Sequence, residues 1–272
     1  ILFVLAGTKT WVISQAIYAF EVERHIHIDR LVIATTKVGK KVIEEGDEEG
    51  SQAPMWTNKA GPEEVFTQLR RDYNIELKEK TISLLEDDKG SALTDARTPE
   101  ECKAAAYSIL RVILRLRTSG SDQVYCVFAG GRRLMVAYLM SALSLAGSKN
   151  YHLYYVLVHP EEASHCRTFY YKPRTADTLH LPSGDISTNH VTIDIAEIPF
   201  LRLGEKYASV VDRAGNYDQV VSHLQEYLSL ESKPVESDPD VRRVAPKLVG
   251  TNQEFLNTLH ELDMYARAGT KH

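Results

Sequence analysis

A run of two glycines and two arginines, residues 130–133, is the part of this sequence that most clearly points to chemistry. Gly130 and Gly131 allow a ligand to approach the backbone closely, or allow a positive φ. Arg132 and Arg133 follow at the amino end of an expected helix, where the helix dipole disfavours cations. A bound phosphate would balance that charge, and the guanidinium fork matches phosphate oxygens. The pattern indicates an anion site, with a glycine turn and solvated arginines as the alternative.

A second segment, Gly7-Thr8-Lys9-Thr10, places two hydroxyls and an ammonium group before another expected helix. Backbone amides point outward at such a helix start, and the dipole there favours an anion. The spacing is not the G-x-G-x-x-G of dinucleotide-binding proteins. A plain strand-to-helix turn capped by Thr10 explains the same residues.

Two further loops could add side chains to the same site. Thr35 and Thr36 follow a second apolar run, and Arg97 lies in the loop after a third. Lys40 and Lys41 are better explained as part of a solvated helix face.

The segments that must position these loops alternate between two types. Short apolar runs typical of buried strands cover residues 1–6, 31–34, 81–85, 124–129 and 153–158. Helical spacing follows in residues 11–23, in a short helix ending at 41, and in 63–73, 98–117 and 132–146. This alternation predicts a Rossmann-like, doubly wound α/β fold with a mostly parallel sheet. Carboxyl ends of parallel strands share one edge, so the loops should converge on one basic pocket.

The remaining segments carry weaker patterns. Residues 45–62 read as a surface loop, and residues 167–171 and 190–195 as short strands joined through a loop at 181–187. Helices are expected at 220–230 and 253–266, with a linker at 233–246. We therefore predict a ligand-binding domain over residues 1–203 and a small helical extension over residues 204–272.

Composition excludes several classes of function. The 272 residues carry a net charge of −5, which argues against a surface that coats DNA. No apolar stretch reaches the roughly 18 residues of a membrane span, and residues 1–6 are too short for a signal peptide. Cys102, Cys126 and Cys166 have no zinc or disulfide spacing, and the histidines show no ligand motif. We expect a cytoplasmic protein without metal or other cofactor.

Several segments together resemble the NE0113-type CARF proteins of type III CRISPR systems. They are Gly7-Thr-Lys-Thr, Asp95-Ala-Arg-Thr-Pro-Glu-Glu, Phe128-Ala-Gly-Gly-Arg-Arg-Leu-Met, Ala142-Leu-Ser-Leu-Ala-Gly, Tyr155-Val-Leu-Val and Ile195-Ala-Glu-Ile-Pro-Phe-Leu-Arg. The resemblance covers residues 1–203 and leaves the tail uncovered.

This resemblance implies a homodimer whose paired domains bind a cyclic oligoadenylate, with four adenylates preferred and six as the alternative. It further implies a ring nuclease that cleaves this messenger without metal, through the ribose 2′-OH, to linear products ending in a 2′,3′-cyclic phosphate. The residues it assigns to catalysis are Lys9 and Arg133. The loops described above and the resemblance together predict ligand binding by Gly7, Thr8, Thr10, Thr35, Thr36, Arg97, Gly130, Gly131, Arg132 and Met135.

Two positions depart from the family pattern. The family usually has Gly-Thr-Ser-Pro at residues 7–10 and Gly-Gly-Arg-Lys at residues 130–133, so that Lys9 and Arg133 replace the Ser and Lys linked to cleavage. Positive charge is retained, which favours binding, but arginine cannot donate a proton at neutral pH. A non-catalytic sensor, part of a larger effector, is therefore the alternative, and a transcription regulator is disfavoured because residues 204–272 lack a basic stripe.

Overall fold

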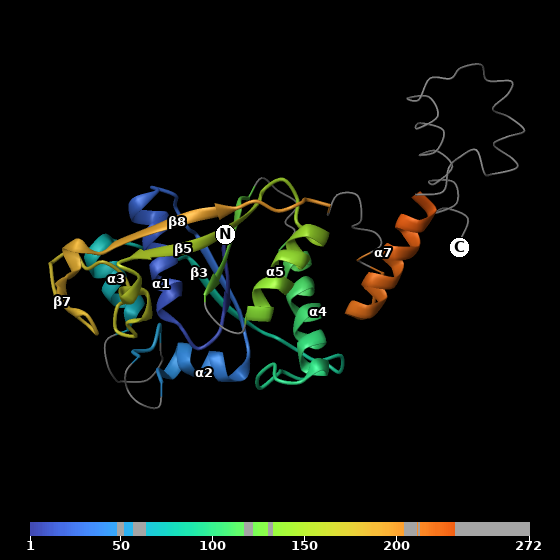
Figure 1. Cartoon of the computed structure of the whole chain (residues 1–272), viewed down its shortest axis with the longest axis horizontal. Helices are drawn as coiled ribbons and strands as arrows, with labels where there is room; N and C mark the ends of the chain where they lie inside the picture. The colour runs from blue at the N-terminus through green and yellow to red at the C-terminus, as the bar shows by residue number, and fades with distance from the viewer. Residues whose placement is uncertain are drawn as a thin grey trace, which may run out of the picture. The chain divides into compact units, whose positions relative to one another are not determined.

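A computed structural model describes residues 1–47, 52–56, 64–116, 122–129, 133–203, 211 and 213–231 (Figure 1). The chain divides into two compact units, Ile1–Ala208 and Ser209–His272, which are described separately. The predicted helix at 253–266 and linker at 233–246 lie outside the described residues. The predicted boundary at 203/204 stays a prediction.

Within the described part of the first unit, a six-stranded sheet has the order β3-β2-β1-β4-β5-β8. The strands are β1 Leu2–Ala6, β2 Arg30–Thr35, β3 Glu79–Leu84, β4 Val124–Ala129, β5 Tyr151–His159 and β8 Thr192–Ile198. Neighbours from β3 to β5 are parallel, and β8 runs antiparallel to β5. The Rossmann-like fold class is therefore confirmed. The order of the chain reverses between β1 and β4, which makes their carboxyl ends the switch point where such folds bind ligands.

Helices lie on both faces of this sheet. They are α1 Trp11–Tyr18, α2 Lys37–Glu45, α3 Val65–Tyr73, α4 Pro99–Arg115 and α5 Arg133–Ala146. Tyr125 and Tyr154 reach the α1 side, where their ring centroids lie 5.0 and 5.3 Å from that of Phe20. Tyr151, an odd number of residues before Tyr154 on the same strand, points to the opposite face. There its hydroxyl donates to the Ile113 carbonyl of α4 at 3.1 Å, and α4 lies beside α5 (Figure 1).

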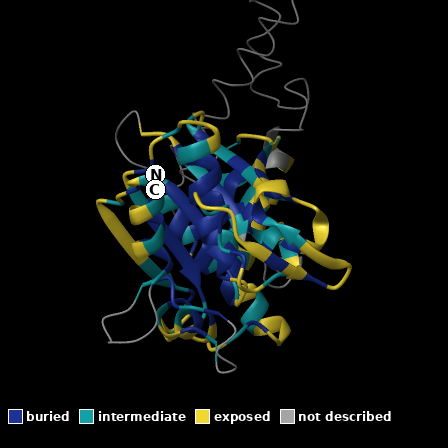
Figure 2. Ribbon diagram, turned by 90° about the vertical axis from the view of Figure 1, so that its left-hand side faces the viewer, coloured by how far each residue is buried: buried dark blue, intermediate teal, exposed yellow. Residues whose placement is uncertain are grey.

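The core follows the apolar runs of the sequence. All five residues of β1 and five of the six residues of β2 are buried, and the centre of the sheet is dark blue in Figure 2. Cys126 is fully buried in β4, as its apolar neighbours predicted. A strand covered by helices on both faces has no solvent side, which is why β1 reads as an unbroken apolar run.

The helix predicted over residues 98–117 is observed as α4, and its start is fixed by local sequence. Thr98 Oγ1 accepts a hydrogen bond from the Glu101 amide at 3.2 Å, and Glu101 Oε2 accepts one from the Thr98 amide at 3.0 Å. Pro99 takes the first helical position. This reciprocal capping box fixes where the loop after β3 ends.

The predicted strand at residues 167–171 is wrong. Phe169 and Tyr171 are buried, but the carbonyls of Phe169 and Tyr170 accept side-chain hydrogen bonds from Gln15 and Ser14 of α1 at 2.8 and 2.7 Å. Alternating buried aromatic residues are also typical of a strand. Here, however, side chains of α1, and not a neighbouring strand, form hydrogen bonds with the backbone of this segment. A hairpin of β6 Thr178–Leu181 and β7 Gly184–Ser187 occupies the region predicted as a loop.

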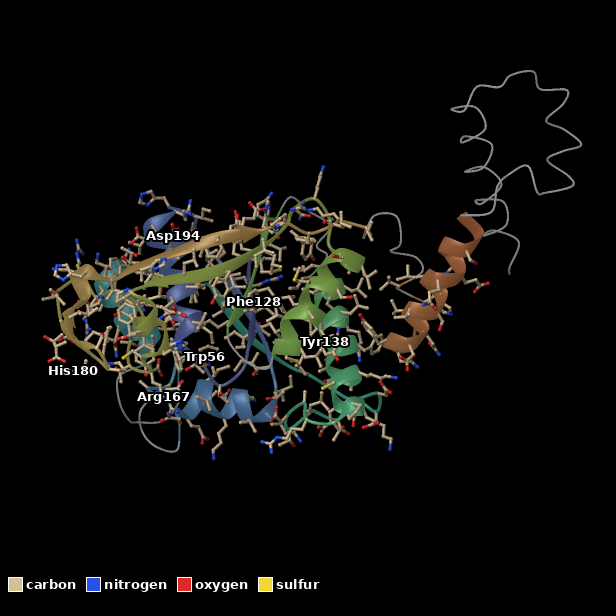
Figure 3. All side chains as sticks on the ribbon, in the orientation of Figure 1. Trp56, Phe128, Tyr138, Arg167, His180 and Asp194 are labelled. Atoms are coloured by element: carbon tan, nitrogen blue, oxygen red, sulfur yellow. The ribbon has the colours of Figure 1, made fainter. Side chains whose placement is uncertain are left out.

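Two further segments differ in detail from the predictions. The first predicted helix ends as α1 at Tyr18 and continues as a π-helical turn, η1 Ala19–Glu23. Residues 45–62 are not simply a surface loop, because Met55 is fully buried and its amide donates to Ile43 at 2.8 Å. Trp56, labelled in Figure 3, stacks on Phe66 with ring centroids 5.2 Å apart.

In the second unit, the described helix is α7 Tyr217–Glu231, which confirms the helix expected at 220–230. It begins earlier than expected because Asn216 Oδ1 caps it, accepting from the Gln219 amide at 2.9 Å. The first unit also contains two short 3₁₀ turns, η2 Glu161–His165 and η3 Thr188–His190.

Candidate functional site

A cleft with a volume of about 260 Å³ opens at the carboxyl ends of β1 and β2. It is lined by Leu5, Ala6, Gly7, Thr8, Lys9, Thr36, Val38, Asp95, Ala96 and Met135. Four of these residues were predicted to bind ligand and one, Lys9, to act in catalysis. The cleft therefore gathers the loops after β1, β2 and β3 with one residue of α5.

The sheet register brings these loops together. β1 and β2 pair in parallel with Leu5 opposite Ala34, so the residues that follow each strand leave the sheet at the same edge. The loop after β3 is held there by backbone hydrogen bonds, from Lys37 to Leu93 at 2.9 Å and from Val38 to Thr94 at 3.3 Å. The convergence that parallel topology predicted is therefore present for these three loops.

The amino end of α1 provides the donors for an anion. Ile13 donates to the Thr10 carbonyl at 2.9 Å, but the amides of Trp11 and Val12 have no acceptor anywhere in the described ranges. Such first-turn amides carry the positive end of the helix dipole. Exposed Lys9 adds a full charge directly before them. Its Nζ lies 6.0 Å from the ring centroid of Trp11, whose Nε1 is anchored to the Ser164 carbonyl at 3.1 Å.

The amino end of α2 offers no comparable set of donors. Its first two amides are used by the carbonyls of Leu93 and Thr94, as described above. The next amide, that of Gly39, donates to the Thr36 hydroxyl at 3.4 Å. Thr36 lines the cleft as a helix cap, so among these two helices the unused first-turn amides belong to α1 and not to α2.

Two predicted threonines lie beneath the cleft and do not line it. Thr10 is fully buried, does not cap α1 with its side chain, and donates its hydroxyl to Gln52 Oε1 at 3.0 Å. Thr35 is fully buried, and no partner for its hydroxyl exists among the described residues. Their role in ligand binding stays a prediction.

Arg97 lies near the cleft but does not line it. Its exposed guanidinium donates from Nε to Asp95 Oδ2 at 2.8 Å. Asp95 also accepts a hydrogen bond from the Ala96 amide at 2.8 Å through Oδ1. Asp95, Val38 and Ala96 were missed by sequence reasoning, although Asp95 and Ala96 directly precede Arg97.

The glycine-arginine segment can be placed only in part. Gly130, Gly131 and Arg132 lie outside the described residues, and Arg133 is described only as the first residue of α5. β4 runs beside β1 to the pair Ala6 and Ala129, so the last described residue before this segment lies beside the end of β1. Met135, two residues into α5, reaches the cleft.

Other features of the described residues carry less chemistry. A cavity of about 150 Å³ lies between α3 and β3, and an open depression borders the hairpin β6–β7. Across the described ranges, His, Cys, Asp and Glu side chains form no group of three that could hold a metal ion. The same ranges contain no helix with the length and apolar character to cross a bilayer.

Comparison with known families adds one match. The family model described as CRISPR-associated protein NE0113 matches residues 11–230. The matched range extends past residue 203 and includes most of α7, where sequence reasoning had found no resemblance. A comparison with curated proteins finds no match.

Proposed function

Because this chain belongs to the family of CRISPR-associated protein NE0113, we propose that it binds and cleaves cyclic oligoadenylate as a homodimer. Cyclic tetra-adenylate is the preferred ligand. The protein acts in the cytoplasm as a ring nuclease that ends the signal of a type III CRISPR system. No metal ion or other cofactor takes part.

One observation carries this proposal. Lys9 directly precedes the unused amides of α1, at the switch point of the sheet. Helix amides and an ammonium group together form a strong site for a phosphate diester. The adjoining apolar wall, including Val38 and Met135, suits a nucleobase better than it suits a free inorganic anion. A nucleotide satisfies both parts of the cleft.

The size of the cleft supports a shared site. Its volume of about 260 Å³ lies below the range of about 300–1,000 Å³ that is usual for drug-sized ligands. One cleft suits a single nucleotide unit, so one protomer cannot enclose a ring of four by itself. Two clefts related by a dimer axis would hold two opposite nucleotides of such a ring. The proposed homodimer is thus the arrangement that matches ligand symmetry to protein symmetry.

Cleavage needs little beyond positioning and charge. The 2′ oxygen of one ribose forms a bond to the neighbouring phosphorus, and the bond from phosphorus to the 5′ oxygen breaks. The 2′-OH loses its proton and the 5′ oxygen gains one, so no water is consumed and the product is an isomer of the ring. Lys9 and Arg133 would stabilise the charge that develops on the phosphate, and Lys9 can also supply the proton.

The test is incubation of the purified protein with cyclic tetra-adenylate and cyclic hexa-adenylate in EDTA, followed by chromatography over time. We expect linear products ending in a 2′,3′-cyclic phosphate. Lys9→Ala and Arg133→Ala should each abolish turnover. Lys89→Ala, which removes an exposed lysine from the loop between β3 and α4, should not. Turnover in the Lys9→Ala/Arg133→Ala double variant would refute the catalytic assignment.

The departures at Lys9 and Arg133 from the usual family residues favour one alternative. In it, the chain is a sensor domain that binds the ring without cutting it, and an effector attached to or associated with it responds. Tight binding of either ring with no product over the same time course would select this alternative.

A further inference from the structure

The cleft has two chemically different ends. Lys9, directly before α1, forms the cationic end, and Asp95 contributes a carboxylate on the loop after β3. A carboxylate repels phosphate, so this second end has no use in binding the diester itself. It must face a part of the ligand that donates hydrogen bonds.

The structure fixes the orientation of this carboxylate. Oδ1 accepts from the Ala96 amide and Oδ2 from Arg97 Nε, both at 2.8 Å. The loop itself is tied to α2 through the carbonyls of Leu93 and Thr94. The Asp95 side chain is 28% exposed, and the residue lines the cleft, so a ligand there can reach it. A held carboxylate gives directional recognition at a low cost in side-chain entropy.

Much of the remaining lining is apolar. Leu5, Ala96 and Met135 are buried, whereas Val38 remains 40% exposed beside them. An exposed aliphatic side chain in a cleft is the kind of surface that a flat base can cover.

We infer that Asp95 is a specificity residue that selects adenine by accepting a hydrogen bond from the exocyclic amine, with the base packed against Val38 and Met135. This inference rests on the proposed function. Arg97 is then a positioning residue, which balances the charge of Asp95 and does not bind the phosphate. Bases that carry a carbonyl in place of that amine would turn an acceptor toward the carboxylate and be rejected.

The experiment compares two rings of equal charge and size. One is cyclic tetra-adenylate, and the other is the cyclic tetranucleotide of purine riboside, in which hydrogen replaces the exocyclic amine. Binding is measured by calorimetry at fixed salt. A hydrogen bond to a charged group predicts that the wild-type protein prefers the adenylate ring by at least about ten-fold.

The variants assign that preference to Asp95. Asp95→Asn should reduce it to less than about three-fold, mainly by weakening the adenylate ring. Arg97→Gln should retain it, because Asp95 remains. Asp88→Asn, the same change at an exposed site in the same loop, should leave both affinities unchanged. Thermal unfolding of each variant checks that it is folded.

Three results would overturn the inference. Equal binding of the two rings by the wild-type protein removes adenine selection altogether. A preference that survives Asp95→Asn assigns selection to another group. Binding of neither ring by the folded wild-type protein refutes the proposed function itself, so that the two failures are distinguishable.

Discussion

Thr35 and Gly39 are in direct contact where β2 passes into α2, so that a Cβ atom on Gly39 would lie 2.0 Å from the Thr35 hydroxyl oxygen. The same atom would lie 3.2 Å from the Gly7 carbonyl oxygen of the cleft wall. Glycine at position 39 is therefore what allows α2 to approach the ends of β1 and β2. Thr36 and Val38, which line the cleft, lie between these two residues in the sequence.

Gly39→Ala should destabilise the protein by about 1–3 kcal/mol, because the added methyl group forces a backbone shift. Alanine ordinarily favours a helix over glycine by about 1 kcal/mol, so a loss of stability would have the opposite sign to that expected from propensity. Denaturant unfolding measures the change. Adding Thr35→Ala should recover part of the loss, since the methyl group would then meet the Cβ of residue 35 at 3.4 Å. No recovery in the double variant would contradict steric overlap as the cause.

Thr10→Val should lower the free energy of unfolding by about 1–3 kcal/mol, because it leaves the buried Gln52 amide oxygen without the Thr10 hydroxyl. Thr10→Ser keeps the hydroxyl and should cost less. If Thr10 instead binds ligand directly, Thr10→Val would weaken binding of cyclic tetra-adenylate while leaving the unfolding midpoint unchanged. Calorimetry and denaturant unfolding of the same two variants separate these outcomes.

The capping box at α4 should make stability depend on pH in the acid range. Backbone hydrogen bonds from Arg97 and then Thr98 lower the pKa of Glu101 below its ordinary value of 4.5. The stability that it contributes is thus fully present above about pH 4.5 and is lost as the pH falls through the lowered pKa of the folded state. Glu101→Gln should be less stable than wild type near neutral pH, and the difference should shrink toward about pH 3. A difference that is constant with pH would exclude this linkage.

Buried tyrosines between α1, α3 and the segment before β6 should make the free energy of unfolding depend on pH in the alkaline range. Burial, and then a hydrogen bond to Asp72, raises the pKa of Tyr171, and burial with a hydrogen bond to Glu23 raises that of Tyr18. A raised pKa stabilises the fold below the ordinary tyrosine pKa, and this stabilisation is lost as the pH rises above about 10. Tyr171→Phe should therefore flatten the alkaline fall in unfolding free energy. Titration of tyrosine absorbance should find an unchanged number of groups near pH 10 in that variant, since Tyr171 does not ionise there in the folded protein.

Local sequence was sufficient wherever one segment satisfies its own backbone. The α4 start was predictable because Thr98, Pro99 and Glu101 complete the capping box among themselves. The strands β1 and β4 were predictable because burial on both faces leaves an unbroken apolar run. Local sequence was not sufficient at residues 167–171. The carbonyls of Phe169 and Tyr170 there accept hydrogen bonds from side chains of α1, more than 150 residues earlier in the chain.

The sequence by itself determined the fold class, the family resemblance and the edge of the sheet at which Gly7, Thr36 and Lys9 meet, because parallel strands bring their carboxyl ends to one side. Only the tertiary structure decided which side chains face the cleft. Thr10 and Thr35 turn inward, Arg97 pairs with Asp95, and Val38 and Asp95 complete the lining. Side-chain direction in a loop depends on partners distant in the chain, such as Gln52 for Thr10, and spacing along the sequence does not encode them.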